Sequence, residues 1–282
     1  MNKLSFSVLT GIRLIVVHAG AVSHQDEQVA TALAVAFGAT NNIERRDPTQ
    51  TELEDPAVLV LDNGGQLDWT KHNVDHHQLD RTQVDCAYTL LADCLGVRAD
   101  MAKLFAWFDL GAVMDQQGPY QVAKTINTSP DNLFALFGPA RSYHDKRWAE
   151  DDQYRWDYTV WLACAIRTKL QLYQMLPDLA PRVMSECHGQ KVLRGDILDE
   201  IDHEHCRDLT DMLVDYAKPA IVWFLDDRGY GFGLLRVGDN PAINFAKCEG
   251  MEGVKFAHKG GFILRTVDRK VDVRPLIKAA LA

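Results

Sequence analysis

Residues 13–38 read RLIVVHAGAVSHQDEQVATALAVAFG, and this stretch decides the fold class. It begins with a short apolar run, Arg13 to Val17, whose β-branched residues are typical of a buried strand that ends at His18. The segment VATALAVAF then places alanines between larger apolar residues, which favours a helix packed on a sheet, with Gly38 as its stop. A strand followed by a packed helix indicates the start of an alternating strand and helix fold.

The same alternation continues further along the chain. The run AVLVLD, Ala57 to Asp62, predicts a strand, and another short strand is expected just before Asp75. Helices are expected over 86–96 and, with Asp100 as N-cap, over 100–115. Alternating strands and helices predict an α/β domain with a parallel sheet flanked by helices, which binds ligands beyond the carboxyl ends of its strands.

The sequence pattern changes near residue 190, from helical segments to strand pairs. Residues 127–147 carry turn formers and irregular charge and are interpreted as a connection, followed by a long helix over 151–176 and a second helix after Pro177. Beyond residue 191, AIVWFLD with GFGLLRV predicts one strand pair, and VKFAHKGGFILRT predicts another. We therefore expect an α/β domain with a helical extension over 1–190 and a smaller α+β lobe over 191–282.

Composition excludes several classes of protein. With 47% hydrophobic and 24% charged residues, the chain of 282 residues is typical of a globular protein, and it has no apolar stretch of the roughly 18 residues that a membrane span needs. The net charge of −9 opposes sequence-independent binding of long duplex nucleic acid, so a phosphate ligand must be met locally. The six cysteines form no CxxC motif, which indicates reduced thiols and a cytoplasmic protein.

Metal-capable side chains recur at or just behind the predicted strand ends. A divalent ion that activates water needs carboxylate and imidazole ligands that converge from several elements. Imidazole ligands favour manganese over magnesium, with iron or zinc as alternatives. The sequence offers four such places: His18, His24 and Asp26 in HAGAVSHQDE, Asp62 in VLDNGG, Asp75, His76 and His77 in VDHHQ, and Asp109 or Asp115 in FDLGAVMDQQG.

These motifs, together with RRDP at residues 45–48, follow the order and approximate spacing found in the DHH phosphoesterase superfamily, with His18 and His24 six positions apart where the family usually has five. Within it, the chain most resembles the melanocyte-proliferating-gene family of metal-dependent hydrolases and exonucleases. The segment FAHKGGF, residues 256–262, is similar to an element near the end of that family. The resemblance is close over the first 120 residues and looser beyond them. It implies a two-manganese hydrolase of phosphodiester or phosphoanhydride bonds, with an α/β metal domain and a C-terminal lobe that binds substrate.

The resemblance also implies roles for individual residues. Asp62 would bridge or bind the ions, and His77 would contact the scissile phosphate. Asp109 competes with Asp115 for the carboxylate of the last motif. The ligand set that the family pattern implies is His18, His24, Asp26, Asp62, His76 and Asp115.

Further residues are expected to support this chemistry. Neighbours in an extended chain alternate faces, so Asp75 is expected to orient a ligating imidazole, and Glu27 either does the same or interacts with the helix dipole. Arg46 would bind substrate or else lie at the surface. A glycine pair flanked by cations can cradle phosphate with its amides. The substrate contacts expected in the second lobe are His258, Lys259, Gly260 and Gly261.

Together these features predict a metal-dependent hydrolase that removes nucleotides from the 3′ end of short single-stranded RNA or DNA. Two divalent ions, preferably manganese, would activate water and stabilise the entering and leaving oxygens at phosphorus. One alternative is a phosphatase or pyrophosphatase of small molecules, and another is a metal-binding regulatory protein without catalysis. The sequence leaves the choice between monomer and homodimer open, and no membrane association is expected.

Overall fold

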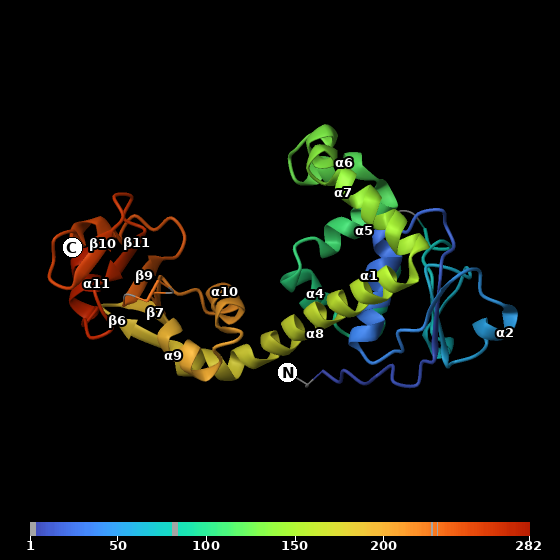
Figure 1. Cartoon of the computed structure of the whole chain (residues 1–282), viewed down its shortest axis with the longest axis horizontal. Coiled ribbons are helices and arrows are strands. Elements are labelled where there is room, and N and C mark those ends of the chain that lie inside the picture. Colours follow the sequence, from blue (N-terminus) through green and yellow to red (C-terminus); the bar gives the residue numbers. More distant parts are fainter. Residues whose placement is uncertain (1–3, 81–83, 227, 230) are drawn as a thin grey trace. The chain divides into compact units, whose positions relative to one another are not determined.

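The chain forms two compact units, residues Met1–Gln171 and Leu172–Ala282 (Figure 1). The structure is a computed structural model, and it describes residues 4–80, 84–226, 228–229 and 231–282. The division falls earlier than the expected boundary at 190, and the strand just before residue 190 belongs to the second sheet. Within the described residues no helix is both long and apolar enough to span a membrane. All six cysteines are free thiols.

The first unit is built on a five-stranded sheet of order β2-β1-β3-β5-β4. Strands β2, β1, β3 and β5 run parallel, and only the short edge strand β4 is antiparallel to its neighbour. The predicted α/β class with a parallel sheet is therefore confirmed for this unit. The strands span Leu14–Val17 (β1), Ile43–Arg45 (β2), Val58–Leu61 (β3), Leu67–Asp68 (β4) and Asn73–Val74 (β5), with a 3-10 turn at Trp69–Lys71.

Alternate residues of β1 and β3 point to opposite faces of this sheet, and both sets are buried. Ile15 and Leu59 join the main core with helices α1 (Gln25–Ala36) and α3 (Ala87–Cys94). Val16 and Val60 face the other side, where Leu53 of the short helix α2 (Gln50–Leu53) covers them. The continuous burial of both strands explains why their sequence is apolar at every position.

The helix predicted over 100–115 is two helices, α4 (Arg98–Leu104) and α5 (Phe108–Gln117), followed by α6 (Pro119–Thr125). The chain is extended at Phe105, so that Phe105 and Phe108 are both buried in the aromatic cluster with Trp107. Asp100 lies within the first turn of α4 and is not an N-cap. The sequence pattern favours one continuous helix, but burial of the aromatic side chains accompanies a break at Phe105.

The connection predicted over 127–147 is wrong, because these residues enter a long helix, α7 (Pro130–Glu150). The turn-forming residues mark the start of this helix. The Ser129 hydroxyl accepts a hydrogen bond from the Asn132 amide, and Pro130 occupies the first turn. Helix α8 (Asp152–Val183) then runs without interruption through Pro177 and Pro181, so no separate helix begins after Pro177.

The second unit holds a six-stranded sheet of order β10-β11-β9-β8-β7-β6, antiparallel except between β7 and β8. The two predicted strand pairs, β8 with β9 and β10 with β11, are confirmed. Helix α11 and the 3-10 turn Phe245–Cys248 pack against the sheet in one apolar core. The elements are β6 (Met184–Cys187), β7 (Gln190–Arg194), α9 (Gly195–Ile201), α10 (Cys206–Ala217), β8 (Ile221–Leu225), β9 (Phe232–Arg236), β10 (Val254–Ala257), β11 (Ile263–Thr266) and α11 (Arg274–Leu281).

Candidate metal centre

Three parallel strands of the first unit end at the same edge of the sheet, and each is followed by metal-capable side chains. His18 follows β1, Asp62 follows β3, and the triplet from Asp75 to His77 follows β5. Because β1, β3 and β5 run in one direction, their carboxyl ends meet at this edge.

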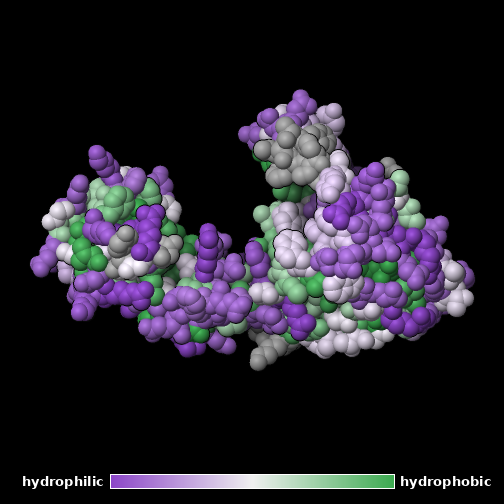
Figure 2. All heavy atoms as spheres, viewed as in Figure 1, coloured by the Kyte–Doolittle hydropathy of each residue, from purple (hydrophilic) through white to green (hydrophobic). Residues whose placement is uncertain are grey.

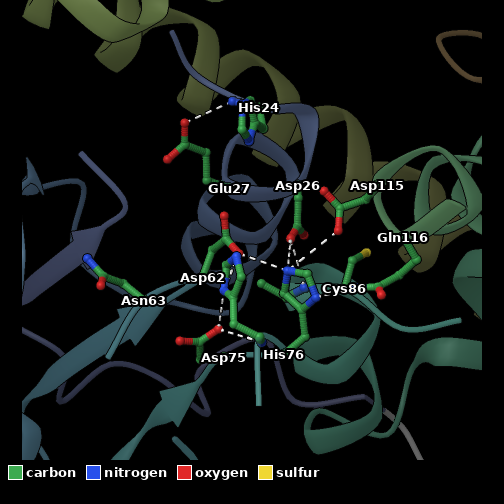
Figure 3. A network of polar contacts seen from close by, with 12 residues as sticks. His24, Asp26, Glu27, Asp62, Asn63, Asp75, His76, Cys86, Asp115 and Gln116 are labelled. Carbon is green, nitrogen blue, oxygen red and sulfur yellow. Dashed lines mark hydrogen bonds and ion pairs between the residues drawn. The ribbon is translucent and has the colours of Figure 1, made fainter. Parts of the chain in front are cut away.

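The imidazole of His76 lies at the centre of a group of carboxylates (Figure 3). Its Nε2 atom is 3.0 Å from Asp62 Oδ1, 3.4 Å from Asp26 Oδ2 and 3.5 Å from Asp115 Oδ2. The side-chain amide of Gln116 contacts the other ring nitrogen, Nδ1. Four residues expected to bind metal thus converge on one point from four separate elements or loops. Gln116 is marked in the sequence only by its place in MDQQG.

The two helical carboxylates are held there by their own elements. Asp26, in the first turn of α1, accepts hydrogen bonds of 3.0 Å from the backbone amides of Ala87 and Tyr88 at the start of α3. Asp115 projects from α5, which packs against α1 and α3. Asp109, the competitor for this place, is in none of the metal-capable groups that the described part of the chain forms.

The backbone around Asp62 is unusual. Asp62 itself adopts a left-handed conformation with a φ of 54°, and Gly64 and Gly65 also have positive φ values. A non-glycine residue in this region is strained by roughly 1–3 kcal/mol, and such strain is typical of functional sites. The turn brings the Gly65 amide to 2.6 Å from Asp75 Oδ2, which explains the glycine pair after Asp62.

Asp75 orients the second histidine of the triplet. Its Oδ1 is 2.6 Å from His77 Nδ1 and accepts from the His77 amide at 3.0 Å. The side chain of His77 is 59% exposed, and its Nδ1 lies 3.7 Å from Asp62 Oδ1. The imidazole that Asp75 orients is therefore His77, which stands at the exposed rim of the group.

A second metal-capable group shares Asp62. One ligand atom each from His18, Glu27 and Asp62 lies within 4.8 Å of the others. Sequence reasoning gave Glu27 only a supporting role. His24, predicted as a ligand, is exposed and lies outside every metal-capable group of the described residues, although its backbone amide donates to Glu27 Oε1 at 2.9 Å.

The electrostatics of the centre favour a bound cation. Burial, together with the charges of Asp62 and Asp115, raises the pKa of Asp26 well above its usual range. Burial also raises the pKa of Asp115, and raises that of Glu27 to about 7 despite the neighbouring Arg45 guanidinium. Crowded carboxylates of this kind repel one another, and a divalent cation relieves that repulsion. The carboxylate and imidazole donors suit manganese, iron or zinc.

Arg46, expected to bind substrate, is engaged by two acidic side chains. Its guanidinium contacts both carboxylate oxygens of Glu52, at 2.8 and 2.6 Å, and Glu44 at 2.7 Å. The bidentate contact with Arg46 holds the pKa of Glu52 down at about 2. A phosphate would therefore have to displace a carboxylate to reach Arg46.

The expected substrate contacts of the second unit lie in the turn between β10 and β11. The Gly260 amide donates to the His258 ring at 3.0 Å, and the Gly261 amide donates to the His258 carbonyl at 2.7 Å. Both amides are therefore used within the turn and do not form a phosphate cradle. Gly261 has a φ of 69°, and an added Cβ would lie 2.1 Å from Asn244 Oδ1. Lys259 and His258 border a cavity of about 580 Å³.

A larger cavity of about 890 Å³ lies within the first unit. Helices α1 and α5 line it through Gln25, Leu110 and Met114, so the same two helices serve the cavity and the metal centre. Pale and green, less hydrophilic residues lie over α5 on the face shown in Figure 2. Trp161 of α8 also lines the cavity and is 64% exposed, whereas Trp148 is fully buried.

Comparisons with protein-family models, with curated proteins and with solved structures found no match to this chain.

Proposed function

We propose that this protein is a divalent-metal-dependent phosphodiester hydrolase that removes nucleotides from the 3′ end of short single-stranded RNA or DNA. The observation that carries the proposal is the position of His76 Nε2, within 3.5 Å of carboxylates from Asp26, Asp62 and Asp115. The direction of digestion is inferred from the resemblance of the motifs to DHH phosphoesterases.

The donor set fits a metal ion better than a structural ion-pair network. One imidazole cannot neutralise three carboxylates, and Asp26 and His76 are both nearly inaccessible to water. Buried charges persist only when they are paired or bind metal. His76, Asp26, Asp62 and Asp115 would hold one ion, and Asp62 would be shared with a second. Two metal ions held in this way would supply an activated water and would stabilise the charge at phosphorus.

The remaining residues of the site would bind and orient the ester. His77 is exposed at the rim, and its hydrogen bond to Asp75 fixes the plane of the ring. It would therefore present Nε2 to a phosphate oxygen of the substrate. Gln116 would hold His76 in one ring orientation, so that Nε2 stays directed at the three carboxylates.

The larger cavity of the first unit favours a nucleotide over pyrophosphate as the substrate. A volume of about 890 Å³ suits a ligand with a base and a sugar, and the exposed indole of Trp161 offers a face for stacking. The net charge of −9 disfavours long polyanions, so the substrate would be a short oligonucleotide. A small-molecule phosphatase is the second candidate, and the acidic charge is the observation that favours it.

The test is stepwise shortening of a 5′-labelled oligonucleotide from its 3′ end in the presence of Mn²⁺. Asp62→Ala and His76→Ala should each lose at least about 100-fold in rate, because each removes a metal ligand. The matched controls Asp239→Ala and His203→Ala alter exposed residues of the second unit and should keep full activity.

Three outcomes would count against the proposal. Full activity of Asp62→Ala and His76→Ala would place the chemistry elsewhere. Hydrolysis of pyrophosphate or phosphomonoesters with intact oligonucleotides would favour the small-molecule phosphatase. Tight Mn²⁺ binding with no hydrolysis of any phosphate ester would favour a metal-binding regulatory protein.

A further inference from the structure

Glu27 is a buried carboxylate with one oxygen left without a partner. The side chain is only 1% exposed to solvent. Its Oε1 accepts from the His24 amide at 2.9 Å and from Arg45 Nη2 at 3.2 Å. Its Oε2 makes no hydrogen bond within the described part of the chain. In Figure 3 the dashed line at Glu27 runs from one oxygen to His24, and the other oxygen carries none. A buried, unpaired carboxylate oxygen is unfavourable in a protein interior unless a ligand satisfies it.

The contact with Arg45 does not account for this oxygen. A structural pair of arginine and glutamate is commonly bidentate, with each carboxylate oxygen taking one N–H. Arg45 instead gives Glu27 a single contact from Nη2, which also donates to the Val22 carbonyl, while Nη1 donates to the Ala149 carbonyl and Nε has no partner among the described residues. The salt bridge thus fixes the orientation of Glu27 while leaving Oε2 free.

Two other metal-capable side chains lie beside Glu27. A ligand atom of His18 and one of Asp62 are each within 4.8 Å of the Glu27 carboxylate. The three residues come from the end of β1, the first turn of α1 and the end of β3. The His18 imidazole makes no hydrogen bond with the residues that the structure describes and contacts only the ring of His24 among the aromatic side chains there, at 6.2 Å between centroids. Asp62 belongs to this group and to the His76 group alike, as expected of a carboxylate shared by two ions.

We propose that Glu27 is a ligand of the second metal ion, together with His18 and Asp62, and that the His24 side chain is not. This inference rests on the two-ion centre of the proposed function. It moves one ligand of the first motif from the exposed His24 imidazole to the buried glutamate three residues later. His24 keeps a structural role, because its backbone amide holds Glu27 Oε1 in place.

The test counts metal ions without reference to activity. Protein is dialysed to equilibrium against Mn²⁺, and the metal content per chain is measured by elemental analysis. The wild type should hold two ions, Glu27→Gln and His18→Ala one each, and His24→Ala two. Glu44→Gln is the matched control, since Glu44 is a half-exposed residue that pairs with Arg46, and it should also hold two. Electron paramagnetic resonance should show a spin-coupled pair in the wild type and an isolated ion in Glu27→Gln.

Loss of a folded protein must be separated from loss of a ligand. Glutamine retains an oxygen that accepts from the His24 amide, but it leaves Arg45 without its counter-ion. The double variant Glu27→Gln with Arg45→Met removes the buried cation together with the carboxylate, and it should also hold one ion with an unchanged circular dichroism spectrum.

Each contrary result points to a different failure. Two spin-coupled ions in folded Glu27→Gln, or in the double variant, would overturn the inference, as would fewer than two ions in the wild type. One ion in His24→Ala beside two in Glu27→Gln would restore His24 as the ligand. Two ions in the wild type and one in Glu27→Gln, with no hydrolysis of any phosphate ester, would refute the proposed function and leave this inference standing.

Discussion

Binding of Mn²⁺ to this protein should release protons, because the central imidazole is charged without metal. Burial lowers the pKa of His76, but its hydrogen bond to Asp62 and the charges of Asp26 and Asp115 outweigh burial and raise that pKa to about 9. An imidazole ligates only in its neutral form. At neutral pH the ion must therefore displace a proton from His76.

The size of the effect follows from that pKa. Well below it, an ion that displaces one proton binds tenfold more tightly for each unit of pH. Between pH 6 and pH 8 the apparent affinity should thus rise about 100-fold, or by about 2.7 kcal/mol. Glu27, whose buried carboxyl has a pKa of about 7, adds about tenfold between pH 6 and 8 if it is a ligand.

Isothermal titration calorimetry with Mn²⁺ at pH 6, 7 and 8 measures both quantities. Each titration is run in two buffers that differ in ionisation enthalpy, and the difference in heat gives the protons released. His76→Asn should lose most of the affinity and the proton release, while His203→Ala, at an exposed histidine, should match the wild type. Affinity that changes less than threefold across this range, with no proton released, would refute the assignment of His76 as a charged group that becomes a ligand.

Four further predictions concern stability and substrate binding. In the metal-free protein the raised pKa values of Glu27 and His76 stabilise the fold fully only below their unfolded values of 4.5 and 6.5, and this stability is lost as the pH rises through about 7 and about 9. The melting temperature without metal should therefore fall between pH 5 and 9 and Mn²⁺ should reverse most of the fall; a rise in the metal-free protein would contradict this. Trp161→Ala should raise KM for a dinucleotide about fivefold or more through lost stacking, leaving bis(p-nitrophenyl) phosphate hydrolysis unchanged, and Trp156→Ala, outside the cavity lining, is its control. Gly261→Ala should lower the free energy of unfolding of the second unit by about 1–3 kcal/mol in calorimetry, because it forces a non-glycine residue into a left-handed turn against Asn244; an unchanged transition would count against that geometry. Arg46→Ala should change the free energy of unfolding by less than about 1 kcal/mol, because the ion pairs of Arg46 with carboxylates are partly exposed. A larger loss would show a structural role for Arg46.

The parallel sheet and the convergence of its strand ends could be predicted from the sequence because each signal is local. Continuous apolar runs at β1 and β3 need two covered faces, and a polar residue directly after each run must lie at the carboxyl edge. The placement of Asp62 and His76 followed from the same rule, whereas Asp26 and Asp115, which lie on helices, were expected as ligands from the resemblance to the family motifs.

The misses have physical causes that lie beyond local pattern. The turn formers before Asn132 cap a helix, and composition alone does not separate a cap from a loop. Helix α8 continues through Pro177, and Leu176 and Leu179 near this proline are buried, so the helix depends on packing that the local sequence pattern does not show. The role of Glu27 depends on which of its oxygens the His24 amide and Arg45 leave free. Spacing in the sequence does not encode that choice.

The most direct test of the two-ion centre is anomalous diffraction at the manganese absorption edge from crystals grown with Mn²⁺. Two peaks should appear at the carboxyl edge of the first sheet, about 3.5–4 Å apart. One should be bound by His76, Asp26, Asp62 and Asp115, and the other by His18, Glu27 and Asp62. Absence of any peak at this edge in crystals that contain manganese elsewhere would contradict the account.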